Sequence, residues 1–111
     1  MARAGETAAA ELYLRLGFAI VDRNYRARAG EIDVIARRAD VVVFCEVKTR
    51  SSERWGVPSE AVSYRKQMKL RALASQWLAD RRPGLVDIRF DVVSVVARGP
   101  RLEITHIPDA F

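Results

Sequence analysis

Two runs of residues that favour extended strands, 31–37 and 41–49, constrain the fold of this chain more than any other feature. Both runs are rich in valine and isoleucine, which are common in β-strands. Only a short turn around Ala39 and Asp40 separates them. Strands joined by so short a connection pair antiparallel. The sequence therefore predicts an antiparallel hairpin at the centre of a sheet.

Side chains alternate between the two faces of such a hairpin. One face would carry only apolar or small residues, namely Ile32, Val34, Ala36, Val43, Cys45 and Val47. The opposite face would carry Glu31, Asp33, Ile35, Arg37, Val42, Phe44, Glu46 and Lys48. We expect the first face to pack on the hydrophobic core and the second to present the polar groups.

The turn also predicts a register. With the turn centred between residues 39 and 40, the paired residues are Ile35 with Phe44, Asp33 with Glu46, and Glu31 with Lys48. The Asp33 and Glu46 β-carbons would then lie about 5 Å apart. Carboxylates at that distance repel each other unless a cation binds between them or one is protonated. A register shifted by two residues would keep the same faces and break this pairing, so that alternative stays open.

A divalent ion that accepts hard oxygen ligands, Mg²⁺ or Mn²⁺, would relieve the repulsion between Asp33 and Glu46. Lys48 follows on the same face, about 7 Å along the strand. Its ammonium group could orient or activate water, or stabilise charge on a phosphate. This set suits metal-assisted hydrolysis of a phosphodiester. A structural salt bridge between Glu31 and Lys48 would explain part of the same face without catalysis.

The rest of the chain predicts a single α/β domain over residues 1–111, with the element order αβββαββ. The expected elements are a helix at 6–16 with Leu12 and Leu16 on one face and Gly17 as its cap, a strand at 18–22, a basic turn at 23–29, a polar loop after Arg50, a helix from Ser59 or Ser63 to Arg81, and strands at 88–97 and 102–107. Leu70, Leu73, Ala74, Trp77 and Leu78 form the apolar stripe of the second helix. These elements predict a mixed sheet of about five strands flanked by helices.

Charge favours a polyanionic partner. The net charge is +5, and all but three of the 19 basic residues are arginine, whose planar group suits phosphate oxygens. An arginine-rich genome would also explain this excess. No apolar run approaches the ~20 residues needed to cross a bilayer, so we expect a cytoplasmic protein that does not engage a membrane. The single cysteine, Cys45, excludes an intramolecular disulfide.

Several segments together resemble the YraN family of small bacterial proteins, which looks related to Holliday-junction resolvases and to the restriction-endonuclease-like PD-(D/E)XK superfamily. The most specific are Gly30-Glu31-Ile32-Asp33 and Phe44-Cys45-Glu46-Val47-Lys48-Thr49-Arg50. The others are Gly5-Glu6, Tyr13-Leu14, Asn24-Tyr25-Arg26, Lys66-Gln67, Arg89-Phe90-Asp91-Val92 and Ala110-Phe111. Cys45 stands where valine is expected, but it points to the core.

The resemblance implies a Mg²⁺- or Mn²⁺-dependent nuclease that acts on structured or branched DNA in repair or recombination. It implies that Asp33, Glu46 and the Val47 carbonyl bind the metal and that Lys48 is the catalytic lysine. Glu6 would complete the site, although its own position also suits the positive N-terminus of a helix. Glu31 and Gln67 would line the site, and a buried, hydrogen-bonded glutamine is an equal alternative for Gln67.

Candidate phosphate contacts lie near these residues in the sequence or by the resemblance: Arg26, Arg28, Arg50, Arg54, Arg65, Lys66 and Lys69. Each is equally an ordinary solvated charge. Trp55 could stack on a base or cover the sheet edge, and His106 is not expected to act as a base. DNA is favoured over RNA, and the likeness to resolvases suggests a homodimer. A non-catalytic nucleic-acid-binding or repair-scaffold module with the same fold is the alternative function.

Overall fold

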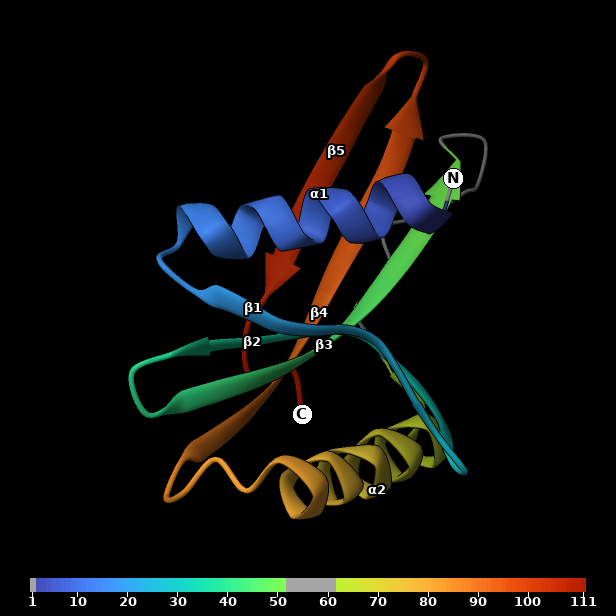
Figure 1. Ribbon diagram of the computed structural model, residues 1–111. Helices are drawn as coiled ribbons and strands as arrows, with labels where there is room; N and C mark the ends of the chain where they lie inside the picture. Colours follow the sequence, from blue (N-terminus) through green and yellow to red (C-terminus); the bar gives the residue numbers. More distant parts are fainter. Residues whose placement is uncertain (1, 52–61) are drawn as a thin grey trace.

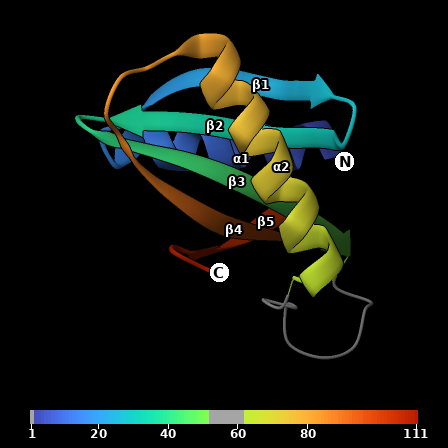
Figure 2. The ribbon, with the colours of Figure 1, turned by 90° about the horizontal axis from the view of Figure 1, so that it is seen from below.

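The computed structural model describes residues 2–51 and 62–111. Its elements are α1 (Ala2–Arg15), β1 (Ala19–Ala27), β2 (Gly30–Arg38), β3 (Val41–Ser51), α2 (Tyr64–Arg81), β4 (Asp87–Arg98) and β5 (Arg101–Ile107). The five strands form one sheet in sequence order, in which only the β3–β4 pair is parallel. The two helices cover opposite faces of this sheet (Figures 1 and 2). The expected α/β fold, a mixed five-stranded sheet flanked by helices as in restriction endonucleases, is confirmed.

The middle parts of β2, β3 and β4 are buried on both faces, which corrects the prediction of one core face and one polar face. Against α1, the sheet contributes Val34, Ala36, Val43 and Cys45 to a cluster with Tyr13 and Phe18. Against α2, it contributes Ile35, Val42 and Phe44 to a second cluster with Leu70, Leu73 and Trp77. The predicted apolar stripe of α2 is therefore confirmed. It packs on the sheet face that carries Ile35, Val42 and Phe44, which was predicted to present the polar groups.

The predicted register of the central hairpin is confirmed where β2 and β3 are paired, from Arg38–Val41 to Val34–Cys45. Beyond Cys45, β3 continues beside β4 as far as Ser51. The β1–β2 hairpin instead bends towards α2, as Figure 1 shows. Ile32 accordingly packs in the α2-side cluster with Ile35 and not with Val34 as predicted. The bend leaves a point of divergence between β2 and β3.

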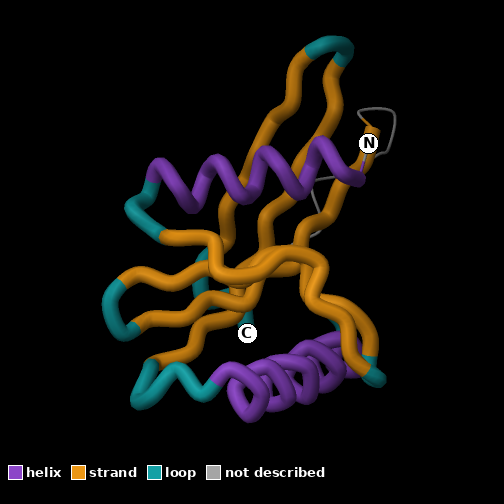
Figure 3. The backbone as a smooth tube through the Cα atoms, in the orientation of Figure 1, coloured by secondary structure: helices purple, strands orange, loops and turns teal. Residues whose placement is uncertain are grey.

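Residues 23–27, predicted as part of a basic turn, continue β1 up to the Arg28–Ala29 connection. Figure 3 shows β1 and β2 running together to their far end. Arg23 lies opposite Val34, and Tyr25 lies opposite Ile32. The prediction was wrong because backbone pairing with β2 supplies hydrogen bonds that do not depend on side-chain polarity.

The helix boundaries also refine the prediction. Helix α1 starts at Ala2 and ends at Arg15, and Gly17, with a φ of 86°, suits the expected glycine cap. Its buried positions are Gly5, Ala9, Ala10 and Tyr13, whereas Leu16 is 40% exposed. Helix α2 begins after Ser63, whose hydroxyl accepts from the Lys66 amide at 3.1 Å. Within the described residues, no helix is long and apolar enough to span a bilayer.

Candidate metal centre

Asp33 immediately precedes Val34, and Glu46 immediately follows Cys45, at the end of the paired part of β2 and β3. They meet, but not as the directly opposed pair that was predicted. The Asp33 Oδ2 atom accepts a hydrogen bond of 2.8 Å from the backbone amide of Val47. Its carboxyl group also hydrogen-bonds to the Glu46 side chain. The bend of the hairpin therefore places the two acids together beside the backbone of β3.

The contact perturbs the ionisation of Asp33. Burial, followed by the hydrogen bond and the charge of Glu46, raises the pKa of Asp33 to about 8, while the Val47 amide acts in the opposite direction. Glu46 itself is only 9% exposed. The raised pKa means that a proton, or a cation in its place, is favoured beside Asp33.

A third acid reaches this point from another element. Carboxylate oxygens of Glu6 in α1 and of Glu31 and Asp33 in β2 all lie within 4.8 Å of one another. The approach of α1 depends on Gly5, because a Cβ atom at this buried position would collide with the hydroxyl of Thr49 in β3. Glu6, the acid expected to complete the site, therefore lies beside Asp33 through this contact between α1 and β3.

Asn24 also belongs to this cluster, and no site role was predicted for it. Its Nδ2 atom donates to Glu6 Oε1 at 2.8 Å and to Glu31 Oε1 at 3.5 Å. Its φ of 54° is left-handed, a conformation that asparagine tolerates better than most residues. In the sequence, Asn24 differs from the basic residues around it, but its contact with Glu6 could be inferred only once the position of α1 was known.

Two predicted phosphate contacts are bound to the acids instead. The Arg26 guanidinium donates to Glu31 Oε2 at 2.6 Å, although 79% of the Arg26 side chain is exposed. The Lys66 ammonium lies 3.1 Å from Glu46 Oε2. Each base neutralises part of the charge that the acids accumulate. Neither position was predicted to pair with an acid of the site.

Gln67 lies beside Lys66 but uses its amide locally. Its Nε2 atom donates to the carbonyl of Val62 at 2.8 Å, which fixes the residue before the N-cap of α2. The alternative of a partly buried, hydrogen-bonded glutamine therefore describes what the structure contains.

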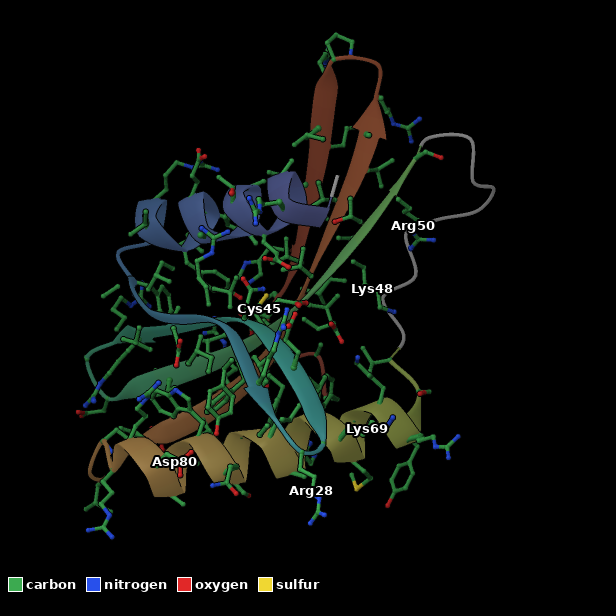
Figure 4. The ribbon with its side chains drawn as sticks, turned by 45° about the vertical axis from the view of Figure 1, so that its right-hand side comes forward. Arg28, Cys45, Lys48, Arg50, Lys69 and Asp80 are labelled. Atoms are coloured by element: carbon green, nitrogen blue, oxygen red, sulfur yellow. The ribbon has the colours of Figure 1, made fainter. Side chains whose placement is uncertain are left out.

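The remaining basic candidates that the structure describes lie on β3, on α2 and at the end of the β1–β2 hairpin. Lys48 and Arg50 extend from β3, Lys69 lies on α2, and Arg28 lies at the end of the β1–β2 hairpin (Figure 4). Arg28, Arg65 and Lys69 are exposed, whereas Lys48 and Arg50 are partly buried. Arg54 and Trp55 lie outside the described residues.

A second buried acid, Asp91 in β4, has a very different environment. Its carboxylate accepts from Tyr13 Oη at 2.6 Å, from two Arg89 nitrogens at 2.8 and 2.9 Å, and from the Asp109 amide at 3.0 Å. His106 Nε2 lies 2.8 Å away. Burial alone would raise the pKa of Asp91, but these hydrogen bonds hold it below its ordinary value. His106 thus belongs to a structural network remote from the acid cluster in sequence.

Cys45 is 1% exposed and packs against α1, as predicted. Burial raises the pKa of its thiol, which makes a reactive thiolate unfavourable.

Comparison with known proteins gives a consistent assignment. The family described as "Uncharacterised protein family UPF0102" matches residues 5–95. A UPF0102 protein of Rhodococcus jostii (strain RHA1) is 46% identical over 108 residues, covering 96% of this chain and 92% of the relative. One from Alkaliphilus oremlandii (strain OhILAs) is 47% identical over 109 residues, covering 96% and 93%. The matched region contains every residue of the acid cluster, and the chain belongs to the UPF0102 (YraN) family.

Proposed function

We propose that this protein is a Mg²⁺- or Mn²⁺-dependent nuclease that hydrolyses phosphodiester bonds, with structured or branched DNA as its substrate. The observation that supports this most is the meeting of Glu6, Glu31, Asp33 and Glu46 where β2 diverges from β3. A protein has no structural need to gather four carboxyl groups, because each must be neutralised or protonated. A bound divalent ion offsets that cost.

The donor set fits such an ion. Mg²⁺ and Mn²⁺ prefer oxygen ligands, and Mg²⁺ holds them at about 2.1 Å, so ligands of one ion lie within about 4.2 Å of each other. The oxygens of Glu6, Glu31 and Asp33 lie within 4.8 Å of one another, so small side-chain rotations bring them into that range. In this proposal Asp33 and Glu46 are the principal ligands, with the Val47 carbonyl, and Glu6 completes the site.

The bound ion would supply Lewis acidity and a water molecule of lowered pKa. The residues of the chain have separate tasks around it. The Val47 amide orients Asp33 through the 2.8 Å hydrogen bond, and Asn24 orients Glu6. Lys48, two residues beyond Glu46 in β3, would orient the attacking water or stabilise the charge on the phosphate.

The exposed cations of the same region favour a nucleic acid as the substrate. Arg28, Arg65 and Lys69 are exposed, and the last two lie on α2 close in sequence to Lys66, which contacts Glu46. The net charge of the chain is +5. Such residues bind phosphates without reading sequence, which suits a substrate recognised by its shape. Cleavage of both strands of a junction would require two centres, and this leads us to include a homodimer in the proposal.

A non-catalytic nucleic-acid-binding module is the second candidate. The pairing of Arg26 with Glu31 and of Lys66 with Glu46 favours it, because these bases neutralise two of the acids without a metal. This candidate predicts salt-dependent binding of DNA and no turnover.

Cleavage assays separate the two candidates. Purified protein is incubated with junction, flap and single-stranded DNA, with Mg²⁺, with Mn²⁺ and with a chelator. We expect metal-dependent cleavage, and Glu46→Gln should lower its rate by about 100-fold or more, since its ligand oxygen is lost. Arg98→Gln, on the remote β4–β5 hairpin, is the control for a lost charge. The nuclease assignment is wrong if wild type cuts none of these substrates or if Glu46→Gln cuts as fast as wild type.

A further inference from the structure

The ion pair between Lys66 and Glu46 differs from a surface salt bridge. The Lys66 Nζ atom lies 3.1 Å from Glu46 Oε2, where 11% of the Glu46 side chain is exposed. Glu46 already hydrogen-bonds to Asp33. The Lys66 ammonium group therefore places a positive charge directly against an acid that the proposed metal site requires.

The position of Lys66 is fixed by the start of α2. Its backbone amide donates to the Ser63 hydroxyl at 3.1 Å, and the next residue, Gln67, anchors the Val62 carbonyl at 2.8 Å. The backbone is thus held on both sides of Lys66, while 46% of its side chain is exposed. A long side chain on a fixed backbone can leave Glu46 by rotation alone, without a movement of the helix.

A divalent ion bound by Glu46 and the ammonium group of Lys66 would repel each other at this distance. From this we infer that Lys66 is the built-in counter-ion of the metal-free centre, which a divalent cation must displace from Glu46. The inference rests on the proposed function for the metal site and adds that Lys66 competes with the metal ion for Glu46. Metal loading then releases a cation beside Arg65 and Lys69, where a substrate phosphate can bind it.

The coupling is reciprocal. A phosphate group that draws Lys66 away from Glu46 strengthens metal binding, and a bound metal strengthens phosphate binding by the same factor. Lys66 thus neutralises Glu46 until a metal ion binds to the acid and a polyanion binds to the lysine. Lys66 is a positioning and gating residue in this scheme and does not act on the reacting bond.

The test is Mn²⁺ titration by calorimetry, without nucleic acid, on three proteins: wild type, Lys66→Met and Lys69→Met. Methionine keeps most of the length of the side chain and removes the charge. Lys69 is the matched control, because it is an exposed lysine on the same helix. We expect Lys66→Met to bind Mn²⁺ about tenfold more tightly than wild type, and Lys69→Met to stay within about twofold.

Glu46→Gln is combined with Lys66→Met to locate the effect. The gain in affinity should vanish in the double variant, because Lys66 then has no carboxylate to release. Unfolding curves of each variant verify that it is folded. The inference is overturned if Lys66→Met binds Mn²⁺ no more tightly than Lys69→Met, or more weakly. In that case, a weaker Mn²⁺ affinity in Glu46→Gln than in wild type would still support the proposed metal site. If wild type binds no Mn²⁺ at all, both the inference and the proposed metal-dependent function fail.

Discussion

Asp33 and Asp91 are both acids on interior strands, and their surroundings differ in kind. Asp91 is fully buried and accepts hydrogen bonds from Tyr13, Arg89 and the Asp109 amide, with His106 at 2.8 Å. Asp33 accepts a hydrogen bond from the Val47 amide and faces the acids Glu46 and Glu6. The pKa of Asp91 is accordingly lowered, and that of Asp33 is raised.

The contrast distinguishes an acid whose charge the fold stabilises from an acid that the fold leaves beside like charges. Tyr13, Arg89 and the Asp109 amide donate hydrogen bonds to Asp91, so its charge stabilises the folded state without any ligand. The fold gives Asp33 neighbours of its own sign, and the site becomes favourable only when a proton or a cation is bound there. Acids left in this condition are typical of active sites.

The largest effect is expected at Asp91. Asp91→Ala would leave the guanidinium of Arg89 and the hydroxyl of Tyr13 without their buried acceptor, and breaking such a network costs about 3–5 kcal/mol. Urea denaturation measures the change in the free energy of unfolding. Asp33→Asn is the matched variant, and it should not lower the stability of the metal-free protein. Equal losses for the two variants would contradict the distinction between them.

The two acids should also respond oppositely to pH. The folded-state pKa of Asp33, about 8, exceeds its unfolded value, so its contribution to stability is present below the unfolded pKa and is lost as pH rises through about 8. The pKa of Asp91 is lowered, so its contribution is present above the unfolded pKa and is lost as pH falls.

As pH rises from 5 to 9, the free energy of unfolding of Asp33→Asn should therefore increase relative to that of wild type by at least about 1 kcal/mol. Mn²⁺ should stabilise wild type more at pH 8.5 than at pH 6, because its ligands must be deprotonated. Denaturation of both proteins across this range measures the effect. A difference in stability that does not change with pH would mean that Asp33 ionises normally.

A smaller effect is expected where α1 meets β3. Gly5→Ala places a methyl group against the Thr49 hydroxyl, and overpacking of this kind costs about 1–3 kcal/mol, partly offset by the higher helix propensity of alanine. The displacement moves Glu6 away from Asp33 and should weaken Mn²⁺ binding. The double variant Gly5→Ala/Thr49→Ala, measured by the same titration, should recover most of the affinity. Failure to recover would show that the contact with Thr49 does not position Glu6.

Local patterns in the sequence were enough to predict the hairpin, its register near the turn, and the apolar stripe of α2. Each of these depends on neighbours along the chain: the turn at Ala39 and Asp40 fixes the pairing, and helical spacing fixes the stripe. Residues 23–27 were missed because pairing with β2 extends β1 beyond its apolar start. The burial of Ile35 and Phe44 was missed because it depends on where α2 packs.

The candidate site was predicted in composition but not in geometry. Alternation placed Asp33 and Glu46 on one face, yet it could not show that the pairing of β2 with β3 begins only at Val34. The roles of Asn24 and Gly5 depend on the packing of α1, and the pairing of Lys66 depends on the start of α2. Contacts of this type join elements far apart in the chain, so no local pattern reveals them.

The proposed function depends most on a divalent ion bound by Asp33 and Glu46, with Glu6 beside Asp33. Anomalous diffraction from crystals soaked in Mn²⁺ tests it most directly. We expect an anomalous peak within about 2.2 Å of oxygens of Asp33 and Glu46, with the Lys66 side chain turned away from Glu46. An empty cluster at saturating Mn²⁺, with Lys66 still bound to Glu46, would contradict it.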